Sequence, residues 1–184
     1  LRGKVVGIVG LGRIGTSVAQ RMKSLGCDVV FHDPFIRDGM DKALGIRKAS
    51  SVVELLEQSD IVTIHCNLTS ENKHLINSEM ISKFKRGAIL VNTARGPLVE
   101  ESSLVAALRN GTLGAAALDV LEVEPCTDGH LAGVPNLIVT PHAAHFSVES
   151  VIERRKQAVE VAIDAIRGNR LRNVVNGPII QTSH

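Results

Sequence analysis

The feature that most constrains the fold is a regular alternation of short apolar runs with amphipathic segments. The apolar runs cover residues 4–10, 28–33, 60–66, 88–93, 115–120 and 136–141. Most of them are apolar at consecutive positions, which is typical of parallel strands that are covered by helices on both faces. Between them, the sequence predicts helices over residues 14–26, 50–59, 100–111 and 147–168. This alternation predicts an α/β fold, with right-handed crossovers and a doubly wound parallel sheet.

A glycine-rich turn, GLGRIG, begins at Gly10, directly after the first predicted strand and at the start of the first predicted helix. In such a G-x-G-x-x-G motif, Gly10 permits the tight turn and Gly12 lets a pyrophosphate approach the backbone. Gly15 lets the helix pack closely on the strand. The N–H groups of Arg13 and Ile14 are expected to face the phosphates at the positive end of the helix dipole. The motif predicts a Rossmann-type dinucleotide-binding domain.

An acidic residue, Asp33, ends the second predicted strand and is followed by Pro34. Its distance along the chain from Gly15 is close to the roughly 20 residues expected of the acid that hydrogen-bonds the adenosine ribose. A carboxylate there repels a 2′-phosphate, and no Arg follows it immediately, so NAD is predicted as the cofactor in preference to NADP. Arg37 is the nearest basic residue and is the one feature that argues for NADP.

Composition excludes several classes of function. The chain has 21 Lys and Arg against 19 Asp and Glu, so it lacks the strongly basic character of a nucleic-acid-binding domain. Cys27, Cys66 and Cys126 lie far apart without a C-x-x-C pattern, so we expect a reducing compartment and no disulfide framework. No signal peptide or bilayer-length apolar run is recognisable, so we expect an intracellular protein with no membrane partner.

Charged side chains also follow the later predicted strands. Arg95 precedes a Gly-Pro pair, Asp119 and Glu124 follow the next strand, and His142 follows Pro141. The carboxyl ends of parallel strands meet at one edge of a sheet, which is where such sheets bind their ligands. We therefore expect these side chains to line one crevice.

Four ordered motifs, GLGRIG, NTARG, LDV with EP, and PH, carry a resemblance that runs from Leu1 to about Asn176. The chain resembles the coenzyme-binding domain of the D-isomer-specific 2-hydroxyacid dehydrogenases. This resemblance implies an NAD-dependent oxidoreductase whose partner is a small 2-keto or 2-hydroxy acid. It also implies a catalytic trio, in which Arg95 holds the substrate carboxylate, His142 protonates the developing alkoxide and Glu124 orients the imidazole.

The resemblance extends to the cofactor. Beyond the glycine turn and Asp33, the predicted cofactor contacts are Cys66, Asn72, Thr93, Ala94, Arg95, Asp119, His142 and His145. Asp119 is expected near the nicotinamide carboxamide, with a strand-end acid satisfied by backbone groups as the alternative. Cys66 is interpreted as a buried strand cysteine in preference to a redox switch. His130, His142 and His145 lack the fixed spacing of a third zinc ligand, so no metal site is predicted.

Three details resemble the C-terminal-binding protein branch of the family, the NAD-dependent transcriptional corepressors. They are IHCNLTSENKHLIN from Ile64, PHAA from Pro141 and HDPF from His32. The corepressors usually carry a Trp three residues after the catalytic His, where this chain has His145. The metabolic branch, with glyoxylate or hydroxypyruvate reductases and phosphoglycerate dehydrogenases, has the same trio and stays open as the alternative.

The resemblance also predicts domains, partners and location. Residues 1–176 are expected to form the dinucleotide-binding domain, and residues 177–184 a tail that leads back to a substrate domain largely absent from this chain. A strand almost at the first residue is typical of an excised domain. We expect a homodimer through the apolar stretch 114–123, and DNA-binding repressors as partners of the missing domain. By resemblance the location is the nucleus, with the cytoplasm as the alternative.

Overall fold

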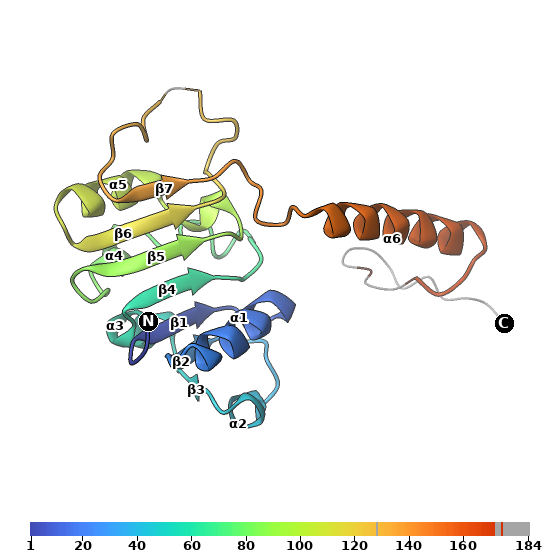
Figure 1. Ribbon diagram of the computed structural model, residues 1–184, viewed down its shortest axis with the longest axis horizontal. Helices are drawn as coiled ribbons and strands as arrows, with labels where there is room; N and C mark the ends of the chain where they lie inside the picture. The colour runs from blue at the N-terminus through green and yellow to red at the C-terminus, as the bar shows by residue number, and fades with distance from the viewer. Residues whose placement is uncertain (128, 172–173, 175–184) are drawn as a thin grey trace. The chain divides into compact units, whose positions relative to one another are not determined.

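The computed structural model describes residues 1–127, 129–171 and 174. The chain divides into two compact units, the first from Leu1 to Ala144 and the second starting at His145. The first unit is a parallel sheet with helices packed on it (Figure 1). In the second unit, the described element is one long helix, α6 (Val148–Ile166). The predicted boundary at residue 176 and the predicted tail 177–184 lie outside the described residues.

The sheet of the first unit has seven strands. They are β1 (Val5–Val9), β2 (Asp28–His32), β3 (Arg47–Lys48), β4 (Ile61–Ile64), β5 (Ala88–Asn92), β6 (Leu113–Leu118) and β7 (Leu137–Val139). All neighbours pair in parallel, in the order β3-β2-β1-β4-β5-β6-β7. The chain runs outward in one direction from β1 to β3 and in the other from β4 to β7, so the switch point lies between β1 and β4. The predicted doubly wound α/β fold is confirmed.

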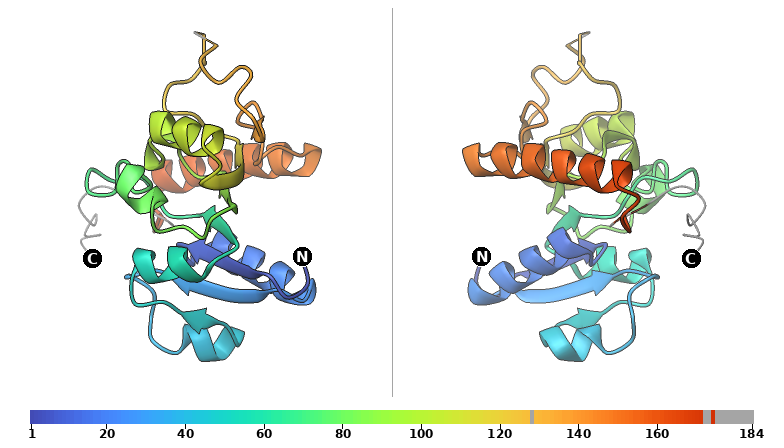
Figure 2. Two further views of the ribbon diagram at one scale, coloured as in Figure 1. Left: turned by 90° about the vertical axis from the view of Figure 1, so that its left-hand side faces the viewer. Right: turned by 90° about the vertical axis from the view of Figure 1, so that its right-hand side faces the viewer.

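Helices cover both faces of this sheet. In the first unit they are α1 (Arg13–Ser24), α2 (Met40–Leu44), α3 (Val52–Gln58), α4 (Ser78–Ile81), the 3-10 turn η1 (Gly96–Leu98) and α5 (Glu101–Arg109). Figure 2 shows α1 and α3 on opposite sides of the strands. The four predicted helices are present, whereas α2, α4 and β3 were not predicted. Each of those three is five residues or shorter, which is too short to show a hydrophobic period.

The core consists of two clusters, one on each side of the sheet. Val6 and Ile8 of β1 point to the cluster under α1, while Val9 points to the cluster under α3 and α5. This division follows from the alternation of side chains along a strand. Leu55 and Leu56 of α3 are fully buried in the second cluster, and burying such a side chain contributes about 1.5–3 kcal/mol. The two clusters fix α1 and α3 on the strands around the switch point.

Within the described residues, no helix is both long and apolar enough to cross a membrane.

Candidate active site

The turn between β1 and α1 requires glycine at two positions. Gly10 has a φ of +92°, and a Cβ there would lie 2.7 Å from the backbone nitrogen of Cys66. A Cβ on Gly15 would lie 2.1 Å from the carbonyl oxygen of Gly10. Both positions therefore exclude a side chain, because α1 and the end of β4 press directly on the turn.

The same turn leaves room for an anion at Gly12, the N-cap of α1. Among the residues that the structure describes, no atom lies within 4 Å of a Cβ built on Gly12, no side chain caps the helix, and no acidic residue occupies its first turn. The backbone N–H groups at this helix end and the positive end of the helix dipole therefore both face an unfilled space. These residues fit the pyrophosphate of a dinucleotide.

Asp33 lies directly against the glycine turn. Its Oδ2 accepts a hydrogen bond from the Leu11 N–H at 2.8 Å, and its Oδ1 accepts one from the Phe35 N–H at 2.9 Å. The carboxylate thus ties the end of β2 to the glycine turn. Each oxygen keeps a further lone pair, which leaves acceptor capacity for ribose hydroxyls.

The segment after β4 contributes Cys66 and Asn72. Burial raises the pKa of the Cys66 thiol, and the charge of Asp33 raises it further. A thiol of this kind is protonated at neutral pH and is a poor redox nucleophile. The Asn72 side chain accepts from the Thr69 N–H and donates to the Asn67 carbonyl, both at 2.7 Å. Asn72 therefore shapes its own loop.

Arg95 lies on a turn that is held by the buried side chain of Asn92. The Asn92 Oδ1 accepts from the Ala94 N–H, and its Nδ2 donates to the Arg95 carbonyl, both at 3.0 Å. The Arg95 side chain is exposed and donates through Nη1 to the Ala94 carbonyl at 2.7 Å. Thr93, at the start of this turn, is also exposed. Asn92 was not predicted, although its place in the NTARG motif was the available signal.

Gly96 brings the Arg95 turn against the segment that carries Glu124. A Cβ on Gly96 would lie 1.8 Å from the Leu121 carbonyl oxygen and 2.6 Å from the Glu122 nitrogen. Any other residue would force these two segments apart. Gly96 was also missed as a site residue, although a Gly-Pro pair after a strand-end Arg is a visible signal.

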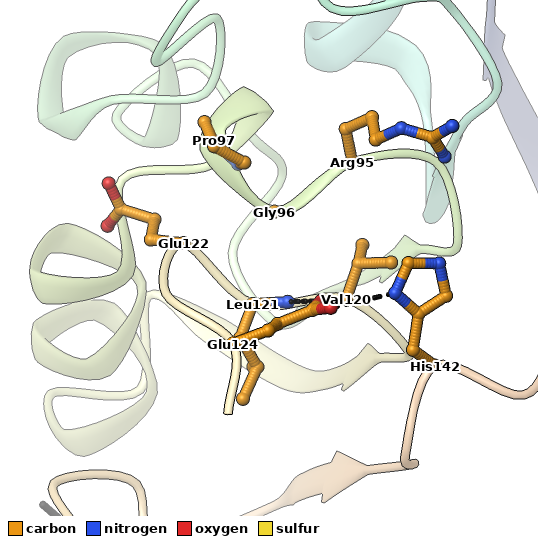
Figure 3. A pocket seen from close by; sticks show the side chains of 8 residues that line it. All are labelled: Arg95, Gly96, Pro97, Val120, Leu121, Glu122, Glu124 and His142. Atoms are coloured by element: carbon orange, nitrogen blue, oxygen red, sulfur yellow. Dashed lines mark hydrogen bonds and ion pairs between the residues drawn. The ribbon is translucent and has the colours of Figure 1, made fainter. Parts of the chain in front are cut away.

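Glu124 and His142 form a hydrogen-bonded pair. The Glu124 Oε2 lies 2.7 Å from the His142 Nδ1, and the Glu124 Oε1 accepts from the Leu121 N–H at 2.8 Å (Figure 3). These two hydrogen bonds lower the pKa of Glu124, so it is ionised at neutral pH. An ionised carboxylate only accepts, so the His142 Nδ1 carries the proton. Nε2 is then the ring nitrogen that can exchange a proton with a substrate.

Asp119 holds the turn on which His142 lies. Its side chain is 5% exposed and accepts from the Thr140 hydroxyl at 2.5 Å and from the N–H groups of Ala143 and Ala144 at 2.9 and 2.8 Å. Burial opposes its ionisation, but these hydrogen bonds outweigh burial and lower its pKa. His142 itself has a φ of +53°, in the left-handed region that a non-glycine residue occupies at a cost. Asp119 therefore stabilises an unfavourable backbone conformation next to the imidazole.

The three predicted catalytic residues meet in one pocket of about 230 Å³. Its lining residues are Arg95, Gly96, Pro97, Val120, Leu121, Glu122, Glu124 and His142 (Figure 3). The pocket follows the carboxyl ends of β5, β6 and β7, which is the edge where such sheets bind ligands. It combines a guanidinium, which suits a carboxylate, with an imidazole that is backed by an ionised acid.

The structure places the predicted cofactor residues in different parts of the fold. Gly10, Asp33 and Cys66 lie together at the switch point, and Asp119 lies beside the turn of His142. Asn72 is held within its own loop, and His145 belongs to the second unit. Among the side chains that the structure describes, none form a group of three or more His, Cys, Asp or Glu that could hold a metal ion.

The family model described as D-isomer specific 2-hydroxyacid dehydrogenase, NAD binding domain, matches residues 1–144. The chain belongs to the D-isomer-specific 2-hydroxyacid dehydrogenase family. Among solved structures, the TT0316 protein from Thermus thermophilus has a TM-score of 0.86 at 40% identity and covers 96% of this chain and 55% of that one. D-lactate dehydrogenase with NAD+ from Lactobacillus jensenii has a TM-score of 0.82 at 30% identity, over 95% and 56% of the two chains. The prediction of a Rossmann-type domain with NAD as its cofactor is confirmed.

Two relatives stand for the two branches that the sequence left open. D-3-phosphoglycerate dehydrogenase of Bacillus subtilis (strain 168) is 41% identical over 178 residues, which are 97% of this chain and 34% of that protein. C-terminal-binding protein 1 of Caenorhabditis elegans is 40% identical over 171 residues, which are 91% and 24% of the two. The chain therefore spans about a third or less of these relatives, and the nearly equal identities favour neither branch.

Proposed function

We propose that this domain, together with a substrate domain, reduces small 2-keto acids to 2-hydroxy acids with NADH, and catalyses the reverse oxidation. The observation that carries this proposal is the convergence of Arg95, Glu124 and His142 in one pocket of an NAD-binding domain. When bound, NADH supplies the hydride that the carbonyl carbon receives. The chain's own residues must then hold the substrate carboxylate and deliver one proton.

Each member of the trio has a role that its contacts support. Arg95 presents a planar fork of donors to the substrate carboxylate. His142 gives the proton on Nε2 to the oxygen that becomes the hydroxyl group. Glu124, ionised and 2.7 Å from Nδ1, accepts the Nδ1 proton and fixes the ring orientation. In the oxidation direction the same ring accepts the proton.

The test is NADH oxidation by the full-length protein with a panel that includes glyoxylate, hydroxypyruvate and pyruvate. We expect turnover with at least one of them. His142→Ala should lower kcat by about 10²–10⁴-fold, as is typical for loss of a general acid. NADH affinity should change little, because the pyrophosphate site is at Gly12. A His142→Ala protein that is as fast as the parent would refute the role of this pocket.

A second candidate is the corepressor branch, in which NAD binding controls assembly on DNA-binding repressors in the nucleus. The PHAA segment and the 40% identity with C-terminal-binding protein 1 of Caenorhabditis elegans support it. The measurement is the binding of short repressor-derived peptides to the full-length protein, with and without NADH. A peptide affinity that rises when NADH is added would support the corepressor branch. A peptide affinity that NADH does not change would favour the metabolic branch.

We also propose that two copies of the domain associate. Ile89 pairs with Ala115, and Ala117 pairs with Ile138. These four side chains lie on the same face of the sheet as the core cluster that α1 covers, but on strands β5 to β7. Ile138 is 65% exposed and Ile89 is 36% exposed, and a contiguous apolar face is unfavourable in water. Sedimentation at micromolar concentration with NAD should show a dimer, and Ile138→Glu should give a monomer. A parent that is monomeric throughout this range would contradict the proposal.

A further inference from the structure

Two glutamates outside the catalytic trio hold each other between the start of α5 and the segment after β6. The Glu122 N–H donates to the Glu101 Oε1 at 2.5 Å, and the Glu101 N–H donates to the Glu122 Oε2 at 2.8 Å. Each carboxylate thus accepts the backbone N–H of the other residue. This reciprocal pair is called the Glu101–Glu122 clamp below.

The remaining carboxylate oxygens of the clamp each contact a histidine. The Glu122 Oε1 lies 2.6 Å from the His74 Nε2, and the Glu101 Oε2 lies 2.8 Å from the His130 Nε2. Glu101 is 6% exposed, and a buried carboxylate is strongly unfavourable unless it is hydrogen-bonded. All four oxygens of the clamp therefore have a partner, as a rigid polar network requires.

The clamp also reaches the turn that carries Arg95. The backbone N–H of His74 donates to the Pro97 carbonyl at 2.7 Å, while the His74 side chain contacts Glu122. Pro97 follows Gly96, whose close approach to Leu121 was described above. His74 therefore connects the two segments that line the pocket, the turn that carries Arg95 and the segment that carries Glu122.

The clamp and the catalytic pair hold the same short segment from different sides. Leu121 and Glu122 are consecutive, and the Leu121 N–H donates to Glu124, which contacts His142. Figure 3 shows the Glu122 side chain directed away from His142, with Glu124 between Leu121 and the imidazole. Fixing the backbone at Glu122 thus restricts the position of the Glu124 carboxylate.

We propose that Glu101 and Glu122 are positioning residues, which hold segment 121–124 so that Glu124 meets His142 at 2.7 Å. This inference rests on the proposed reduction of 2-keto acids. Neither residue needs to touch the substrate. Removal of the clamp lets Glu124 move, and a displacement of about 1 Å at a catalytic group costs on the order of 10²-fold in rate.

The kinetic test compares Glu101→Ala, Glu122→Ala and Glu101→Gln in the full-length protein. The two alanine variants should lower kcat by about 10–100-fold, with NADH affinity within about 2-fold of the parent. Glu101→Gln should recover most of the loss, because its amide oxygen still accepts the Glu122 N–H. Glu100→Ala is the matched control, since the Glu100 carboxylate accepts from the Ser103 hydroxyl instead. Equal losses in Glu100→Ala and Glu101→Ala would overturn the proposal.

A double-mutant cycle tests whether Glu101 acts through Glu124. If it does, Glu101→Ala should change kcat by less than about 3-fold in a Glu124→Gln background. Multiplicative losses would show that Glu101 supports the fold in general and would refute a positioning role. If Glu101→Ala does not fold, the same cycle with Glu122→Ala, at a less buried position, tests whether the clamp acts through Glu124.

Amide hydrogen exchange of Leu121 in the 184-residue chain gives a readout that does not depend on activity. Its N–H is protected by Glu124, so both clamp variants should raise its exchange rate by at least about 10-fold, and Glu100→Ala should not. Unchanged exchange would contradict the clamp. If the parent reduces no 2-keto acid, the proposed function fails, and the exchange of Leu121 still decides whether the clamp orders this segment.

Discussion

Replacing Asp119 should both destabilise the protein and displace His142, the proposed general acid. The Asp119 carboxylate accepts three hydrogen bonds, from Thr140, Ala143 and Ala144, which flank His142 in the chain. A hydrogen bond to a charged group contributes about 1.5–3 kcal/mol. The three donors lie on exposed residues, so water can replace the carboxylate in part. We therefore expect Asp119→Ala to cost about 2–3 kcal/mol in total, well below the sum of three such bonds.

Asp119→Asn separates the charge of this side chain from its shape. The amide oxygen can keep the bonds from Thr140 and Ala143, but the amide NH2 then faces the N–H of Ala144, donor against donor. We expect a loss of about 1–2 kcal/mol, between the parent and the alanine variant. Urea unfolding followed by circular dichroism measures both variants, because the chain has no Trp or Tyr for fluorescence. Asp28→Asn, at an exposed position of β2, is the matched control.

The pH dependence of unfolding gives an independent check on Asp119. Its pKa is lowered in the folded protein, so its contribution to stability is present above the ordinary aspartate pKa of about 4 and is lost as the pH falls below it. The free energy of unfolding of Asp119→Asn should therefore fall less steeply than that of the parent as the pH drops from about 5 to 3. Equal slopes, or an alanine variant within about 0.5 kcal/mol of the parent, would refute the reasoning.

Four further predictions concern the pocket and the cofactor. Arg95→Ala should raise KM for the 2-keto acid and lower kcat. Arg95→Lys should recover only part of the lost activity, because lysine lacks the planar fork of donors. Arg109→Ala, on the exposed surface of α5, should match the parent in the same kinetic assay. Glu124→Gln keeps an acceptor for Leu121 but loses the ionised acceptor that holds the His142 Nδ1 proton, so kcat for reduction should fall; an unchanged kcat would contradict this role. Gly96→Ala should abolish reduction while leaving calorimetric NAD affinity intact, because a Cβ there would lie 1.8 Å from a backbone oxygen. Calorimetry should also show that the parent prefers NAD over NADP and that Asp33→Ala narrows the preference; equal affinity in the parent would exclude the role of Asp33.

The sequence alone determined the fold class and selected the candidate site residues, because both inferences depend on local patterns. Consecutive apolar positions indicate buried parallel strands, and the glycine spacing at Gly10, Gly12 and Gly15 reflects a turn that is built from neighbouring residues. The rule that ligands bind at the carboxyl ends of parallel strands also predicted that Arg95 and His142 lie at one edge of the sheet, where the structure has both of them lining one pocket.

Only the tertiary structure decided which partners these residues have. Asp33 meets the Leu11 N–H, Gly96 meets Leu121, and Glu101 meets Glu122, each across 21 or more residues of sequence. Such contacts depend on how β-strands, helices and turns pack against one another. The backbone group that a charged residue or a glycine will contact therefore cannot be predicted from the sequence. The short elements α2, α4 and β3 were missed for a related reason: their positions are set by packing on the longer elements, since they are too short to carry a hydrophobic period of their own.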